Sequence, residues 1–144
     1  MKKLLVMLAI LAISTSSSMA VSKVAVVDVN AVVTNSSQVK ALKAEQQQKM
    51  KELETWLKTV KADVEKQKTK EGKEKLVKKY DADFAKKQQV IKDNYKKKLQ
   101  EIDTNITRKI ETQAKLKGYT VVLSKNSVLY GGDDITADII NAVK

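Results

Sequence analysis

Residues 117–136 read KGYTVVLSKNSVLYGGDDIT, a stretch with strand-like alternation in a chain otherwise rich in lysine, glutamine and glutamate. Tyr119, Val121 and Leu123 fall on one face, and residues 127–130 form a second short apolar run. Two such runs separated by a few polar residues predict a tight β-hairpin. The hairpin needs a packing partner, and most of the chain before it is polar.

The partner that the sequence offers is KVAVVDV at residues 23–29, about ninety residues upstream. This run is β-branched and apolar on both faces, which predicts a buried strand. The polar residues 35–37 follow it and supply an N-cap for a helix. We expect Asp28 to act as a cap or hydrogen-bonding group, not as half of a catalytic carboxylate pair.

Between these segments, apolar residues recur three and four positions apart, which predicts two long helices at about 38–67 and 73–117. Gly118 follows the second helix, as a left-handed C-terminal cap does. KTKEGKEK at 68–75 has no large apolar residue, so it predicts a turn near 68–73 in preference to one uninterrupted helix. The predicted stripes are Val39, Leu42, Gln46, Met50, Leu53, Leu57, Val60 and Val64, then Leu76, Tyr80, Phe84, Gln88, Ile91, Tyr95, Leu99, Ile102, Ile106 and Ile110, with Trp56 one position off.

The last segment, DDITADIINAVK at 133–144, predicts a short helix capped by Asp134 or Thr136. Its apolar side is Ile139, Ile140 and Val143. The predicted fold class is therefore α+β. A small β head is made of residues 21–37 and 118–144, and a long antiparallel helical hairpin, or coiled-coil arm, is made of residues 38–117.

Residues 1–20 have the features of a secretory signal peptide: two lysines, an apolar run of ten residues and the sequence SMA before the expected cleavage site. Ten apolar residues are fewer than the roughly 20 that span a bilayer. The alternatives are an uncleaved anchor and a buried core helix. The chain has no cysteine, which excludes disulfides, thiolate metal sites and a lipid anchor on cysteine.

Positive charge is concentrated in the predicted arm. Residues 40–117 hold 23 basic and 13 acidic side chains, whereas the segments 21–39 and 118–144 together hold three basic and four acidic ones. Such a region attracts polyanions, anionic lipid surfaces or acidic polypeptides, most strongly at low salt. The mature chain has one arginine and no nucleic-acid recognition motif, so we expect no nucleic-acid partner.

Catalytic patterns are missing from the sequence. There is no histidine, no GxxxxGK[ST] loop and no GxGxxG motif. Gly131-Gly132-Asp133-Asp134 is interpreted as a turn with an acidic cap, not as a phosphate or calcium loop. We therefore predict a protein that is not an enzyme and that uses no cofactor or metal.

A head of about 45 residues without disulfides buries little apolar surface, which favours oligomerisation through the head. Association would cover the second apolar face of the first strand and any open sheet edge. The predicted interface residues are Val24, Val26, Val27, Val29, Val121, Leu123, Val128 and Leu129.

The chain resembles the Skp (OmpH-like) family of periplasmic chaperones. KVAVVDVNAVVTNSS at 23–37, the basic helical hairpin, and AKLKGYTVVLSKNSVLYGGDDITADIINAVK at 114–144 carry the resemblance. It implies a jellyfish-like homotrimer whose heads form a small barrel and whose arms surround a cavity. It also implies that the cavity holds unfolded outer-membrane proteins in the periplasm without using ATP.

Charge and aromatic side chains select the candidate client-binding residues on the arm: Tyr80, Phe84, Lys86, Lys87, Tyr95, Lys96, Lys97 and Lys98. The aromatic residues also fit plain packing inside the hairpin. One alternative function is a secreted, basic coiled-coil structural protein that binds lipopolysaccharide or acidic lipid. Another is a cytoplasmic nucleic-acid-binding protein, which requires residues 1–20 to remain in the mature chain.

Overall fold

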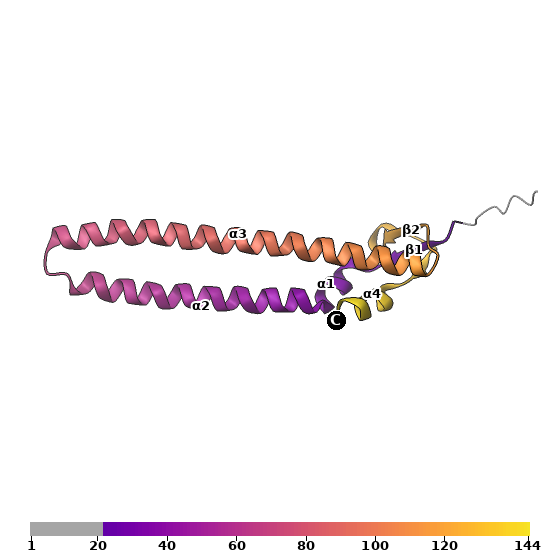
Figure 1. Ribbon diagram of the computed structural model, residues 1–144, viewed down its shortest axis with the longest axis horizontal. Helices are drawn as coiled ribbons and strands as arrows, with labels where there is room; N and C mark the ends of the chain where they lie inside the picture. Colours follow the sequence, from indigo (N-terminus) through magenta and orange to yellow (C-terminus); the bar gives the residue numbers. More distant parts are fainter. Residues whose placement is uncertain (1–21) are drawn as a thin grey trace, which may run out of the picture.

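The computed structural model describes residues 22–144, which form a small head at one end of two long helices (Figure 1). The chain runs through one strand, a short helix and the two long helices, and then returns to the head for two further strands and a last helix. Long helices combined with one small sheet make this an α+β protein, as predicted. The predicted signal peptide lies outside the described residues.

The head contains a three-stranded parallel sheet made of β1 (Val24–Val27), β2 (Val121–Ser124) and β3 (Asp133–Asp134). The strand order is β2-β1-β3, with Val24 opposite Val121 and Ala25 opposite Asp133. The predicted tight hairpin at 119–130 is therefore wrong. Its first run pairs with β1, while its second run forms no strand at all.

The central position of β1 explains this difference. A strand that is apolar on both faces can accept a neighbour on each side, and β2 and β3 take the two positions. The chain then has to cross from one side of β1 to the other, which a tight turn cannot do between parallel strands. A 3₁₀ turn at Lys125–Ser127 and two glycines with positive φ, Gly131 (86°) and Gly132 (87°), make that crossing.

Strand β1 is also shorter than predicted, because helix α1 (Val29–Asn35) begins directly after Asp28. The Asp28 Oδ1 atom accepts the backbone N–H of Ala31 at 3.0 Å, so the expected capping role of Asp28 is confirmed. Ser36 then separates α1 from the first long helix. Its side chain is buried, and its hydroxyl has no hydrogen-bond partner within residues 22–144.

The long helices are α2 (Ser37–Lys66) and α3 (Lys70–Leu116). They are joined by residues 67–69, so the turn comes slightly before the predicted one. Thr69 caps α3 by accepting the N–H of Gly72 at 3.1 Å, which places Gly72 in the first helical turn. At the other end Gly118 has φ 74°, and Tyr119 N–H bonds to Ala114 O at 2.9 Å, which confirms the predicted glycine cap.

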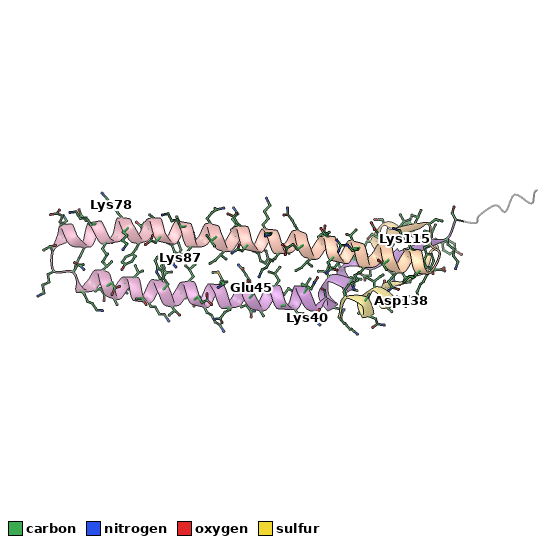
Figure 2. All side chains as sticks on the ribbon, in the orientation of Figure 1. Lys40, Glu45, Lys78, Lys87, Lys115 and Asp138 are labelled. Atoms are coloured by element: carbon green, nitrogen blue, oxygen red, sulfur yellow. The ribbon has the colours of Figure 1, made fainter. Side chains whose placement is uncertain are left out.

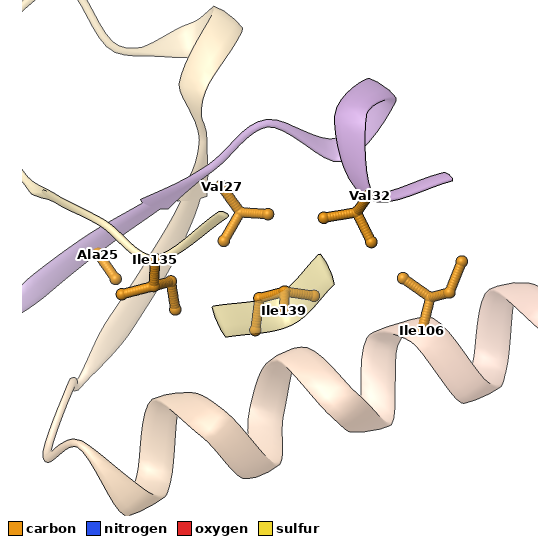
Figure 3. Packing of buried hydrophobic residues seen from close by; sticks show 6 residues of the cluster. All are labelled: Ala25, Val27, Val32, Ile106, Ile135 and Ile139. Atoms are coloured by element: carbon orange, nitrogen blue, oxygen red, sulfur yellow. The ribbon is translucent and has the colours of Figure 1, made fainter. Parts of the chain in front are cut away.

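The core of the head lies between the sheet, α1, the end of α3 and α4 (Thr136–Val143) (Figure 3). Ile139 from α4 is fully buried in it, as the predicted apolar side requires. The last third of α3 therefore belongs to the head as much as to the arm. The buried members of this cluster are Ala25, Val27, Val32, Ile106, Ile135 and Ile139.

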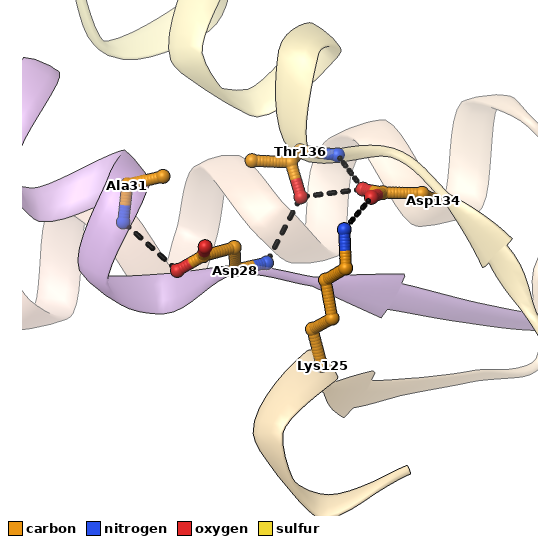
Figure 4. A network of polar contacts seen from close by, with 5 residues as sticks. All are labelled: Asp28, Ala31, Lys125, Asp134 and Thr136. Carbon is orange, nitrogen blue, oxygen red and sulfur yellow. Dashed lines mark hydrogen bonds and ion pairs between the residues drawn. The ribbon is translucent and has the colours of Figure 1, made fainter. Parts of the chain in front are cut away.

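A polar network joins the three strand ends beside this core (Figure 4). Asp28 N–H donates to Thr136 Oγ1 at 2.9 Å, and the Thr136 hydroxyl and N–H both donate to Asp134 Oδ1. Lys125 Nζ lies 2.7 Å from Asp134 Oδ2. Hydrogen bonds from Lys125 and Thr136 lower the pKa of Asp134 to about 2. The N-cap position of α4 is Ile135, which makes no side-chain cap, so the prediction of Asp134 or Thr136 as the cap is wrong. The Asp134 carboxylate instead accepts the N–H of Thr136, the first residue of the helix.

Gly132 and Gly131 allow a paired test of the loop that carries the chain from β2 to β3. A Cβ at Gly132 would lie 2.8 Å from Val26 Cγ1, whereas a Cβ at Gly131 would have no atom within 4 Å. Both Gly→Ala changes place a side chain at positive φ, which costs about 1 kcal/mol. We expect Gly132→Ala to lower the free energy of unfolding in urea by about 1–3 kcal/mol more than Gly131→Ala. Equal losses would contradict this packing.

The Asp134 network predicts a dependence of stability on pH. Because the folded pKa is below the unfolded value, the ion pair stabilises the head above about pH 4 and this stabilisation is lost as the pH falls toward 2. We expect Asp134→Asn to lower the free energy of unfolding by about 1 kcal/mol at pH 7, after allowance for solvent screening. The difference in the free energy of unfolding between Asp134→Asn and the wild type, measured by urea titration, should disappear by pH 2.

The control for this experiment is Asp81→Asn. Asp81 is exposed on α3 and forms no salt bridge within residues 22–144, so its loss should change stability by less than about 0.5 kcal/mol at any pH. A gap between Asp134→Asn and the wild type that stays constant from pH 7 to pH 2 would show that the carboxylate charge is not what stabilises the network.

Candidate binding surfaces of the arm and the head

Helices α2 and α3 run side by side along the arm (Figure 1), and their side chains meet at several levels. Nearest the head, the Asn105 side-chain amide donates to Gln38 Oε1 at 3.1 Å, and further along the arm Lys98 forms an ion pair with Glu45. Nearer the tip, the Tyr80 hydroxyl donates to Asp63 Oδ2 at 3.2 Å. Burial raises the pKa of Tyr80, and this hydrogen bond raises it further.

An aromatic cluster occupies the part of the arm between the last two of these contacts. Trp56 stacks on Phe84 with ring centroids 6.3 Å apart and planes 6° apart, and it meets Tyr80 edge to face at 5.9 Å. Trp56 therefore faces α3, whereas Leu57, the predicted stripe residue, is 41% exposed. That position of the predicted stripe is wrong by one residue. An α-helix has 3.6 residues per turn, so a fixed alternation of three and four residues gradually moves away from the side that faces the partner helix.

Between the aromatic cluster and the head, the two helices enclose an open groove of about 440 Å³. Its base is apolar, with Leu42 and Leu53 buried and Trp56, Ile91 and Tyr95 partly buried. The residues that line it are Leu42, Glu45, Gln46, Lys49, Glu52, Leu53, Trp56, Lys86, Lys87, Val90, Ile91, Asn94, Tyr95 and Lys98.

The charges around the groove are not evenly balanced. Lys98 is paired with Glu45, and Lys49 lies 2.9 Å from Glu52. The hydrogen bond from Lys49 lowers the pKa of Glu52, so this carboxylate is ionised, and its negative charge is balanced by Lys49. In contrast, no carboxylate of the described chain lies within 4.0 Å of Lys86 or Lys87.

Lys87 extends across the groove from the side of α3 that faces α2, whereas Lys78 lies on the opposite side of α3 (Figure 2). The Nζ atom of Lys87 is 5.3 Å from the centre of the Trp56 ring. A lysine over an indole face is a cation–π contact. The end of the groove nearest the tip is therefore both aromatic and positively charged.

The structure divides the predicted client-binding residues into three groups. Tyr80 and Phe84 join the aromatic cluster, and Lys86, Lys87, Tyr95 and Lys98 line the groove. Lys96 and Lys97 are exposed outside the groove, and Lys97 lies 4.0 Å from Glu101 on its own helix.

Sequence reasoning missed five groove residues, which belong to neither predicted stripe and to no predicted site: Glu45, Lys49, Glu52, Val90 and Asn94. Their spacing along the helices gave no signal, because a groove wall lies beside the stripe and not on it.

The head has a second candidate surface on the face of the sheet opposite the core. Val24 and Val26 of β1 share this face with Val121 and Leu123 of β2, which are 44% and 43% exposed. Leu129, in the crossing loop, is 106% exposed. Exposed apolar groups of this density on so small a unit make this face a candidate interaction surface.

The other predicted interface residues are placed differently. Val29 is 41% exposed at the start of α1, and Val128 is partly buried in the crossing loop. Val27 is 1% exposed because it belongs to the core of its own head, and Val26 is 5% exposed.

Within residues 22–144 there is no group of three or more acidic or metal-ligating side chains that could hold a metal ion. None of the helices described between residues 22 and 144 combines the length and the apolarity that a bilayer span requires.

The chain thus combines a small α+β head with two long basic helices that have an apolar groove between them. The model of the family described as outer membrane protein (OmpH-like) matches residues 23–143, so the chain belongs to the OmpH-like, or Skp, family. This family consists of periplasmic chaperones of outer-membrane proteins and not of enzymes. A search of curated proteins gave no match to the chain.

The aromatic cluster predicts a measurable contribution to arm stability. Phe84→Ala removes the ring that stacks on Trp56 and should lower the free energy of unfolding by about 1–2 kcal/mol, less than for a fully buried ring. Urea unfolding followed by Trp56 fluorescence measures this loss. Val90→Ala, at a position 58% exposed on the same helix, is the control and should cost less than about 0.5 kcal/mol. Equal losses would exclude a structural role for the stack.

Proposed function

We propose that the protein is an ATP-independent periplasmic holdase that binds unfolded outer-membrane proteins between basic helical arms and prevents their aggregation. The observation that carries this proposal is the groove between α2 and α3, in which exposed apolar surface lies next to lysines without carboxylate partners in the described chain. Family membership supports the same client class.

The proposed mechanism has two stages. The basic arms first attract acidic, unfolded chains through long-range electrostatics, which raise the association rate. Many weak apolar and polar contacts then hold the client along the arms without a fixed pocket. Because the arms surround the client, its exposed strand edges cannot pair with those of other clients, which is how unfolded β-barrel proteins aggregate.

We further propose that three chains assemble through their heads, with three antiparallel helical arms projecting around a cavity. The exposed sheet face with Val24, Val121 and Leu123 supports this, because association would remove it from water. Val29, Val128 and Leu129 lie on the head outside its core and extend the proposed contact. Residues 21–37 and 118–144 would form the head and residues 38–117 the arm, although Ile106 also serves the head core.

A second candidate function is adsorption to anionic surfaces such as lipopolysaccharide or acidic lipid. The lysines of the arm tip, Lys66, Lys68 and Lys70, are exposed and favour it. This function predicts binding to anionic vesicles without protection of an unfolded client. The two functions are separated by diluting a urea-unfolded outer-membrane β-barrel protein into the chaperone and measuring light scattering and the mass in solution.

The holdase proposal predicts a soluble complex of one client with one trimer, and it predicts that capture depends on charge. Replacing Lys86, Lys87, Lys96, Lys97 and Lys98 by Glu should slow client capture at least tenfold at low salt and flatten its dependence on salt concentration. Stopped-flow fluorescence of a labelled client between 20 mM and 500 mM salt measures both effects.

The matched control carries the same five changes at exposed lysines that do not line the groove, namely Lys58, Lys61, Lys73, Lys78 and Lys92. It has the same net charge, so it separates charge placement from charge amount. Capture rates that stay at the wild-type value across the salt range in the first variant would remove electrostatics from the mechanism. A trimer that leaves the client to aggregate would favour the adsorption function.

A further inference from the structure

Three large apolar side chains of the arm lie outside the groove and are exposed to water. Met50 and Leu57 of α2 are 46% and 41% exposed, and Leu99 of α3 is 42% exposed. None of the three lines the groove. We call them together the apolar row.

The apolar row lies on the side of the arm opposite the groove. Each of its three members directly follows a residue that lines the groove, in the pairs Lys49–Met50, Trp56–Leu57 and Lys98–Leu99. One residue turns the chain by about 100° around an α-helix, so each member is carried away from the groove. The contacts between the helices pair rising residue numbers on α2 with falling ones on α3, so this turn leads to the same face of the hairpin on both helices.

The apolar row has a defined length and spacing. Lys98 pairs with Glu45, so Leu99 lies at about the level of residue 45. Met50 and Leu57 follow five and twelve residues farther along α2, which makes the row about 18 Å long with gaps of roughly 8 and 10 Å. Two packed helices need an apolar contact about every 5 Å, as a heptad pattern provides. The row is therefore too sparse to pair with another helix.

Leu99 connects the orientation of the arm to that of the head. It precedes Ile102 and Ile106 by three and seven residues on the uninterrupted helix α3, so the three project from the same side. Ile106 is buried in the head core, and Ile102 packs against this core. Figure 3 shows Ile106 pointing from α3 toward Val32 and Ile139, with β1 beyond them. The apolar row thus faces the direction in which the sheet lies from α3.

The exposed face of the sheet points in this direction too. Ala25 and Val27 of β1 belong to the core between the sheet and α3. Val24 lies on the far face with Val121 and Leu123, and this face points away from α3, as the apolar row does. Head association through this face, as proposed above, would turn the apolar rows of all arms toward the common axis and the grooves outward.

We propose that the apolar row is the surface that holds the client, and that the groove faces away from the cavity. This rests on the proposed holdase function and assigns its two stages to different faces of the arm. The lysines around the groove act in capture, and Met50, Leu57 and Leu99 act in holding. They contact the lipid-facing side of a client segment that later becomes a transmembrane strand.

An unfolded β-barrel segment fits the row in length and in chemistry. Transmembrane strands alternate apolar and polar residues, and an extended chain advances about 3.4 Å per residue. Side chains on one face of the segment are therefore about 7 Å apart, so the row covers three or four of them. An extended chain has no fixed shape that the row must match. Each contact is weak, which allows the client to leave without ATP.

Photo-crosslinking locates the holding surface. The crosslinker p-benzoylphenylalanine replaces Leu57, Val90 or Thr59 in the full-length mature protein, and a urea-unfolded outer-membrane β-barrel protein is diluted into each variant. Thr59 is exposed on α2, does not line the groove and donates to Thr55 O of its own helix. We expect crosslinks to the client to be several-fold more abundant from Leu57 than from Val90 in the groove or from Thr59.

Substitutions separate holding from capture. Met50→Gln with Leu57→Gln removes two apolar contacts, leaves the charge unchanged and keeps good helix formers in α2. Each half-exposed side chain of this size should contribute about threefold or more to affinity, so the client should dissociate about tenfold faster. The capture rate at low salt should change less than about twofold, because charge sets it.

The matched control is Thr55→Gln with Thr59→Gln, at two exposed positions of the same helix outside the groove. Both rates should change less than about twofold. Circular dichroism and the mass in solution check that each variant keeps its helices and its assembly.

Two peptides of equal composition test the client chemistry. One alternates apolar and polar residues like a transmembrane strand, and the other has the same residues in two blocks. The alternating peptide should compete several-fold better with the client for crosslinking at Leu57. Equal competition would contradict recognition of a strand face.

Other results would also overturn the proposal. One is a stronger crosslink to the client from Val90 than from Leu57, and another is equal dissociation from the row variant and the control. Crosslinks from Leu57 to another arm that persist with client present would show that a second copy covers the row. Light scattering measures client aggregation separately. Failure to suppress aggregation refutes the holdase function, whereas suppression without the expected crosslinks refutes only the assignment of the faces.

Discussion

Parallel pairing between Val24–Val27 and Val121–Ser124 determines the route of the whole chain. Two parallel strands can be neighbours only if the chain leaves one end of the first and returns to the opposite end of the sheet before the second begins. In most proteins a single helix makes that crossover. Here the crossover is the entire arm, from α1 through α2 and α3.

This constraint also explains why the two arm helices differ in length. Helix α2 has 30 residues and α3 has 47, so α3 is longer by about 25 Å. The extra length carries the chain back past the start of α2 and across the head, where Ile106 joins the core and Ile102 and Ile110 pack against it. One continuous helix thereby fixes the direction of the arm relative to the sheet, because bending it away would remove these side chains from the core.

Much of this could be predicted from the sequence, and the failures have a common cause. Periodicity located both long helices, Gly118 marked the end of α3, and Asp28 was recognised as a cap, since each of these is a local signal. The β-hairpin prediction failed because alternation reveals that a segment is a strand but not the direction of its partner. Strand β3 consists of two aspartates, which no propensity scale assigns to a strand.

The groove was harder to foresee, because it arises from what the arm lacks. The predicted stripes contain Gln46 and Gln88, and Met50 is 46% exposed, so the helices do not pack along a continuous apolar seam. The ion pairs Lys49–Glu52 and Lys75–Glu71 are exposed and lie within single helices, where such pairs contribute only a few tenths of a kcal/mol. The arm is consequently held by the head core at one end and by the Trp56 cluster in the middle. In the stretch between them, Gln46 takes the place of an apolar residue in the seam of α2, and the apolar surface of Leu53, Ile91 and Tyr95 stays open at the groove.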